Sequence, residues 1–186
     1  MQLFGNKKHL DTDVSSQVAA AIKGDRRAQK AIFDSLSGKM FAVCLRYMGD
    51  RDSAEDVLQD GFVTLFNKLD TYSGEGSFEG WARKIFVNTA LMSLRRKDVL
   101  RQSEDVDAAW DVKADDPSPT QQIGYEELLA LISSLPPGFR TVFNMYVIEG
   151  YSHKEIGESL GITEVTSRSQ LQRARTMLQN KIKEKY

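Results

Sequence analysis

Apolar side chains recur every three or four residues along most of this chain, a spacing that gathers them on one side of an α-helix. The first clear run extends from Ala28 to Met48 and stops at Gly49, a residue suited to end a helix. A second run starts near Asp52, a capping residue, and a third covers Phe78 to about Lys97. No alternating pattern of apolar and polar residues reaches the length of a β-strand, so the sequence predicts an all-α fold.

The second and third runs each predict one buried and one exposed face. In the second run, Asp56, Gln59 and Asp60 lie opposite the apolar residues and form an acidic patch. This patch is either a solvated surface or a docking site for a basic partner. The buried side of the third run is expected to comprise Phe78, Trp81, Ala82, Ile85, Phe86 and Thr89.

The C-terminal part of the chain predicts shorter helices with clear boundaries. An amphipathic segment from Ile123 to Leu135 is broken at Pro136 and Pro137, and Pro137 can begin the next helix, which extends to Ile148. The remaining predicted boundaries are a capping box at Ser152 and Glu155, a turn at Gly161, and a final helix from Thr163 towards Lys185.

Residues 98–122 contain two prolines and show no sustained periodicity, so they are expected to form a linker between two domains. This segment has a net charge of −5, whereas residues 1–97 carry +3 and residues 123–186 carry +1. The predicted organisation is an N-terminal extension with a first helix (1–27), a helical domain (28–97), an acidic linker (98–122) and a second helical domain (123–186). The charge asymmetry is consistent with a polyanionic partner for the two flanking domains, and equally with a solvated linker between two ordinary domains.

The composition argues against several classes of protein. One cysteine excludes a disulfide framework, and together with two histidines it supplies too few ligands for a structural zinc site. Cys44 lies in an apolar stripe and neither histidine has a partner at triad spacing, so we expect no enzyme and no cofactor. No apolar stretch is long enough to cross a membrane, and the N-terminus has no signal-peptide pattern, which predicts a cytoplasmic protein without membrane insertion.

The strongest chemical signal lies between Ser152 and Arg175, where two helices flank Gly161 at helix-turn-helix spacing. Gly157 is expected to permit close approach of the helices, and Gly161 to adopt the left-handed turn conformation. Arginine and glutamine can bind base edges in the major groove, and serine or arginine can bind phosphates. The alternative is a plain helical hairpin with a solvated cationic face. The residues expected to be exposed on the second helix are Arg168, Ser169, Gln172, Arg173 and Arg175.

A second signal combines aromatic and cationic residues between Tyr72 and Lys97. Single-stranded nucleic acid binds to such surfaces because bases stack on rings while cations hold the backbone. Asn88 interrupts an apolar run and is costly there unless its amide is used, for example on an unstacked base edge. In the alternative, Trp81 and Phe86 belong to the core and Asn88 bonds a neighbouring loop. The cations of this segment are Arg83, Lys84, Arg95, Arg96 and Lys97.

These segments resemble, in order, the parts of an extracytoplasmic-function sigma factor of bacterial RNA polymerase. DSAEDVLQDGFVTLFNKLDTY is similar to the polymerase-binding helix of sigma region two, and GSFEGWARKIFVNTALMSLRRK to the adjoining promoter-melting helix. The segment from LPPGFRTVF to LQRARTML resembles sigma region four. The resemblance covers about residues 29–97 and 128–177. It implies a non-catalytic initiation factor whose partners are core polymerase and promoter DNA, with an anti-sigma factor as a further partner.

The resemblance also implies residue roles. Asp56, Gln59 and Asp60 would contact the clamp helices of the largest polymerase subunit. The minus-ten element would meet Tyr72, the loop to Ser77, Trp81, Lys84 and Asn88, which capture a flipped base, and the minus-thirty-five element would meet Arg168, Ser169, Gln172, Arg173 and Arg175. The acidic linker would follow the RNA path of the polymerase. The chain departs from the family pattern at Val165, Ser167 and Gln172, where relatives more often have glycine, valine, and an aromatic residue or histidine.

Two other classes stay open at this point. A free-standing helix-turn-helix regulator would use its N-terminal helices to dimerise or to sense a ligand, but it needs neither the acidic patch nor the helix that carries Trp81 and Asn88. A helical adaptor that binds no nucleic acid would leave Arg168, Arg173 and Arg175 unexplained.

Overall fold

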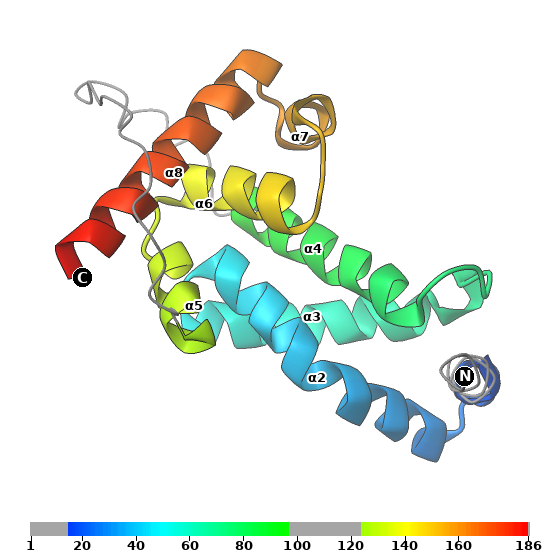
Figure 1. The fold of residues 1–186 in the computed structure, drawn as a ribbon. Helices are drawn as coiled ribbons and strands as arrows, with labels where there is room; N and C mark the ends of the chain where they lie inside the picture. The colour runs from blue at the N-terminus through cyan, green and yellow to red at the C-terminus, as the bar shows by residue number, and fades with distance from the viewer. Residues whose placement is uncertain (1–14, 97–123, 186) are drawn as a thin grey trace, which may run out of the picture. The chain divides into compact units, whose positions relative to one another are not determined.

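The computed structural model describes residues 15–96 and 124–185. The predicted linker and residues 1–14 lie outside the described residues. Within them, every regular element is a helix, which confirms the all-α prediction (Figure 1). By their internal contacts, these residues form two units: unit 1 comprises residues 15–44 and 54–90, and unit 2 comprises residues 45–53, 91–96 and 124–185.

The first half of the chain contains three long helices after a helical segment at residues 15–22. They are α2 (Arg26–Met48), α3 (Arg51–Asn67) and α4 (Phe78–Arg96), with a 3₁₀ turn, η1 (Leu69–Thr71), after α3. The C-terminal elements are α5 (Tyr125–Ser133), α6 (Pro137–Phe143), the π-helical η3 (Asn144–Ile148), α7 (His153–Leu160) and α8 (Glu164–Lys185).

Side-chain caps decide where these helices begin. Asp25 accepts hydrogen bonds from the amides of Arg27 (2.8 Å) and Ala28 (3.3 Å), so α2 starts earlier than the apolar pattern predicts. The amide of Ser53 donates to Asp50 (2.8 Å), which makes Asp50 the cap of α3. The prediction of Asp52 for this role was wrong, because Asp52 already lies inside the first turn of the helix.

In unit 1, α3 and α4 pack closely because Gly61 leaves room for the ring of Phe86. A Cβ atom at position 61 would lie 2.4 Å from that ring. The ring of Phe62 packs edge-on against the same ring, with centroids 5.0 Å apart. It also packs against Phe33 of α2, with centroids 4.5 Å apart. The predicted buried face of α3 is confirmed at its centre, where Ala54, Val57, Gly61, Phe62 and Leu65 are buried.

The buried face of α4 is rotated relative to the prediction. Ala82 and Phe86 are buried as expected, but Phe78, Trp81, Ile85 and Thr89 remain partly exposed. The remaining buried positions of this helix are Val87, Ala90, Leu91 and Leu94. The helix α4 carries apolar residues on more than one face. Which of these faces becomes buried depends on the helices that pack against it.

In unit 2, α8 packs on α5 and α6 through a small apolar core. Leu135, Phe139, Ala174 and Leu178 form its buried centre, and Leu131, Phe143 and Met177 pack around them. The long α8 therefore has one anchored side and one side that the described residues leave exposed. In unit 1, Cys44 of α2 is buried, as the apolar stripe predicts.

Arg140 is a buried polar residue of unit 2, and the local pattern of the sequence did not indicate its role. Its buried guanidinium donates to the carbonyl oxygens of Tyr47 (3.0 Å), Met48 (2.8 Å), Ser133 (2.8 Å) and Leu135 (3.2 Å). The first two carbonyls terminate α2, so a cation stands at the end of a helix where the backbone dipole favours it. Burial lowers the pKa of Arg140.

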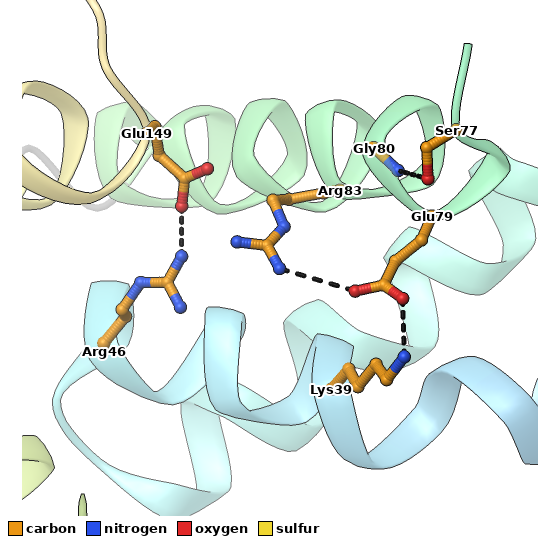
Figure 2. Close-up of polar contacts among 7 residues, drawn as sticks. All are labelled: Lys39, Arg46, Ser77, Glu79, Gly80, Arg83 and Glu149. Atoms are coloured by element: carbon orange, nitrogen blue, oxygen red, sulfur yellow. Dashed lines mark hydrogen bonds and ion pairs between the residues drawn. The ribbon is translucent and has the colours of Figure 1, made fainter. Parts of the chain in front are cut away.

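Two further contacts support the same helix end. The side-chain amide of Asn144 donates to the carbonyl oxygen of Arg46 (2.7 Å), and the guanidinium of Arg46 pairs with Glu149 (Figure 2). Both members of the ion pair are buried, so their charges compensate each other away from water. These contacts fix residues 45–53 within unit 2.

Candidate polymerase and nucleic-acid interfaces

The acidic patch of α3 is exposed as predicted. Asp56, Gln59 and Asp60 occupy the side of the helix opposite the buried Val57 and Gly61. Their spacing places the three side chains on neighbouring turns of one helix face. The patch thus presents two carboxylates and one amide from a rigid, well-packed element, an arrangement that complements a basic surface.

Tyr72, which follows η1, forms a small aromatic cluster with Phe78 and Trp81 at the start of α4. The ring centroids lie 5.2 Å apart for Tyr72 and Phe78, 5.3 Å for Tyr72 and Trp81, and 5.6 Å for Phe78 and Trp81. The Tyr72 hydroxyl donates to the carbonyl oxygen of Gly76 (2.9 Å), which closes the loop on the cluster. All three rings are partly exposed, so they form a surface on which a planar base can stack.

Lys84 and Asn88 are exposed one turn apart on α4. The apolar neighbours of Asn88 in the sequence suggested that its amide would be buried at a cost in free energy. That interpretation was wrong, because Asn88 is exposed. The neighbour Val87 is buried in its place. An exposed amide with free hydrogen-bonding capacity next to a lysine suits contact with a base edge and a phosphate.

The charge of Arg83 is compensated by a neighbouring carboxylate. Glu79 lies between Lys39 of α2 (2.5 Å) and Arg83 of its own helix (3.6 Å), as Figure 2 shows. The amide of Gly80 donates to Ser77, so the N-terminus of α4 is capped beside this network (Figure 2). Lys84 is exposed and has no such carboxylate among the contacts of the described residues.

The helix-turn-helix unit has the local geometry that its sequence predicts (Figure 1). Ser152 and Glu155 form a complete capping box at the start of α7. Gly161 has a φ of 72°, the left-handed region, and its amide donates to the carbonyl oxygen of Gly157 (2.8 Å). A Cβ atom at Gly157 would lie 2.7 Å from the carbonyl oxygen of Ile162. Both glycine predictions are confirmed.

The exposed side of α8 carries most of the predicted DNA-binding residues. Arg168, Ser169, Gln172 and Arg175 are exposed, whereas Arg173 is half-buried at the edge of the packed side. Arg168 forms an ion pair with Glu164 in the first turn (2.9 Å). Because both side chains are largely exposed, this pair holds Arg168 only weakly.

Ser167, at a position where the resemblance implies valine, is accommodated inside the unit. It is fully buried, and its hydroxyl shares a hydrogen bond with Nδ1 of His153 (2.9 Å). The His153 ring stacks on Tyr146, with centroids 4.4 Å apart. Burial and the nearby Arg168 lower the pKa of His153, which favours the neutral ring that this hydrogen bond accommodates. The sequence did not single out His153 for a structural role.

Two negative findings bear on the chemistry. Among residues 15–96 and 124–185, no group of three histidine, cysteine or acidic side chains is placed to hold a metal ion. In the same residues, no helix is both long and apolar enough to cross a membrane.

The comparisons with known proteins agree with this arrangement of helices. The family described as "Sigma-70 region 2" matches residues 32–99, and "Sigma-70, region 4" matches residues 125–178. The ECF RNA polymerase sigma factor SigE of Mycolicibacterium smegmatis is 35% identical over 150 residues, which cover 76% of this chain and 56% of that protein. The ECF RNA polymerase sigma-E factor of Haemophilus influenzae is 29% identical over 171 residues, which cover 86% of this chain and 90% of that protein.

Among solved structures, the sigma factor RpoE of Bartonella quintana, crystallised with the anti-sigma factor NepR, is similar in fold. The TM-score is 0.50 at 21% identity, over 83% of this chain and 96% of that one.

The helices and the two matched regions thus define a sigma-70 type protein with regions 2 and 4. The chain belongs to the extracytoplasmic-function sigma factors, which are non-catalytic subunits for the initiation of transcription. This membership excludes the free-standing regulator and the adaptor considered from the sequence.

Proposed function

We propose that this chain is a dissociable promoter-recognition subunit that uses three exposed surfaces. The α3 patch of Asp56, Gln59 and Asp60 binds the clamp helices of core polymerase. The minus-ten surface, formed by Tyr72, Trp81, Lys84 and Asn88, captures a flipped base. The minus-thirty-five surface on α8 reads the upstream element through Arg168, Ser169, Gln172, Arg173 and Arg175. The observation that carries this proposal is that the capping box and the left-handed turn present an exposed arginine- and glutamine-bearing helix face.

The minus-ten surface offers both parts that base capture requires. Extruding a base costs a few kcal/mol of stacking, which a pocket must offset. The partly exposed rings of Tyr72 and Trp81 supply a stacking surface, and Asn88 supplies donors and acceptors for the base edge. Lys84 can hold the adjacent phosphate because it is exposed.

The division into domains at residues 28–97, 98–122 and 123–186 belongs to the same proposal, as does a cytoplasmic location beside the polymerase. An anti-sigma factor that masks one of the three surfaces is a further proposed partner. Its test is purification of the chain from its native cells: a co-purifying protein that core polymerase displaces supports this partner, and recovery of the chain with polymerase alone contradicts it.

The net charge of −1 limits how tightly the isolated chain can bind DNA. DNA-binding proteins obtain much of their affinity from a basic excess that releases counterions, and this chain has none. We therefore expect the isolated protein to bind promoter duplex weakly and the holoenzyme to bind it tightly. Tight, specific binding without core polymerase in a salt titration would contradict this expectation.

The docking surface is tested with Asp56→Ala combined with Asp60→Ala. The double variant should lose affinity for core polymerase while its unfolding transition is unchanged, since both side chains are exposed. The matched control, Asp34→Ala with Glu184→Ala, removes the same charge from other exposed positions and should bind normally. Equal co-purification of both double variants with core enzyme would show that α3 is not the docking surface.

The upstream reader is tested with Arg168→Ala and Arg173→Ala. Each substitution should weaken recognition by about 1–3 kcal/mol if the side chain reads a base. Arg168 is the more exposed of the two and should show the larger effect on base preference. In vitro transcription with added core polymerase on a genomic fragment library measures both activity and preference. Unchanged promoter use by both variants would refute the assignment.

A further inference from the structure

Val165 and Ser167 both lie in the first turn of α8, where Ser167 is buried and Val165 is exposed. Ser167 is fully buried, and His153 satisfies its hydroxyl inside the helix-turn-helix unit. The fold therefore accounts for Ser167 without any external partner.

The fold provides no such account of Val165. This residue is 74% exposed, the largest value among the exposed large apolar residues of the described parts of the chain. In an exposed helical position, valine is less favourable than alanine because its branched Cβ restricts the side chain. Val165 is therefore free of any structural role in the fold and is available for a contact outside the chain.

The position of Val165 identifies the surface to which it belongs. It is the second residue of α8, and it precedes Arg168 by three positions and Gln172 by seven. Residues at this spacing share one side of a helix, and all three side chains are exposed. In helix-turn-helix proteins the N-terminal residues of the recognition helix contact base edges in the major groove.

The chemistry of the groove restricts what an aliphatic side chain can recognise there. Base edges in the major groove present hydrogen-bond donors and acceptors, and one apolar group, the C5 methyl of thymine. Arginine and glutamine use the polar groups, whereas valine offers only methyl groups. A glycine at this position would offer none.

We propose that Val165 packs against the C5 methyl of a thymine in the upstream promoter element and so gives this chain a thymine preference of its own. The proposal rests on the proposed function, because it requires α8 to enter the major groove. Burial of one methyl group against another corresponds to about a three- to four-fold gain in affinity.

The test uses holoenzyme assembled from core polymerase and the full-length chain. A preferred duplex is first selected from a library randomised over the upstream element. Each thymine of that duplex is then replaced in turn by uracil, which removes only the C5 methyl. Binding of each duplex is measured for the wild type, for Val165→Ala and for the control Val147→Ala. Val147 is also an exposed valine, on η3, at 47%.

We expect one thymine at which uracil lowers wild-type affinity about three- to four-fold. Val165→Ala should bind the thymine duplex as weakly as the wild type binds that uracil duplex, and should not discriminate the two. Val147→Ala should discriminate like the wild type. Discrimination that persists unchanged in Val165→Ala, or a preferred duplex with no uracil-sensitive thymine, overturns the proposal. Failure of the holoenzyme to select any upstream element refutes the proposed function itself, and the thymine contact with it.

Discussion

The helix-turn-helix unit leaves no room for a side chain at Gly157, and Gly157→Val tests this directly. A Cβ atom at this position would lie 2.7 Å from the carbonyl oxygen of Ile162. That oxygen belongs to the backbone, so it cannot rotate away as a side chain would. The carbonyl oxygen of Gly157 also accepts the amides of Gly161 (2.8 Å) and Ile162 (3.1 Å). Moving the turn to relieve the overlap therefore strains the hydrogen bonds that end α7.

The expected magnitude combines three effects. Overpacking a close contact costs about 1–3 kcal/mol. Weakening one of the two hydrogen bonds at the end of α7 adds about 0.5–1.5 kcal/mol. The better helix propensity of valine returns a few tenths of a kcal/mol, roughly 0.3. The free energy of unfolding should thus fall by about 1–4 kcal/mol, which is a large share of the stability of a small protein.

Gly38→Val is the matched control because Gly38 is also a helical glycine, in α2. It is exposed, and a Cβ atom there would meet no other atom within 4 Å. The same substitution should change the free energy of unfolding by less than about 0.5 kcal/mol.

Urea unfolding followed by circular dichroism measures both variants, and binding of the holoenzyme to an upstream-element duplex measures the effect on α8. Gly157→Val should be less stable than the control and should bind the duplex more weakly. If the two variants unfold at the same urea concentration, close packing at the turn is not what requires glycine at position 157.

Two further predictions concern unit 2. Gly49→Ala should cost about 2–4 kcal/mol, because it combines a left-handed φ of 82° with a Cβ atom 2.3 Å from the bonded guanidinium of Arg140. Gly24 is the control, because it has a similar φ of 87° but a Cβ atom there would meet no other atom within 4 Å. Gly24→Ala should therefore lower the free energy of unfolding by only about 1–2 kcal/mol. Equal losses of stability for the two variants in thermal unfolding would disprove the clash with Arg140. An NMR titration should place the pKa of His153 below its ordinary value, and Arg168→Ala should raise it, since Arg168 disfavours the imidazolium. Because the folded pKa is the lower one, this histidine should reduce stability as the pH falls below about 6.5, and an unshifted titration would contradict the packing seen around it.

The sequence by itself determined the features that depend on neighbours a few residues away. The capping box of Ser152 and Glu155 and the left-handed turn at Gly161 close within three to five residues, so local chemistry decides them. The exposure of Asp56, Gln59 and Asp60 also followed from periodicity, because a cluster of polar residues on one helix side has no reason to be buried.

Only the tertiary structure decided which of several apolar or polar groups would be covered. Phe78 and Trp81 are as apolar as the buried Phe86, but the space beside Gly61 accepts one ring, and the other two remain partly exposed. The bonds of Arg140 to the end of α2 join residues more than ninety positions apart, and that of Ser167 to His153 spans fourteen. Such contacts depend on which folded elements pack together, and the local pattern of polar and apolar residues does not specify that packing.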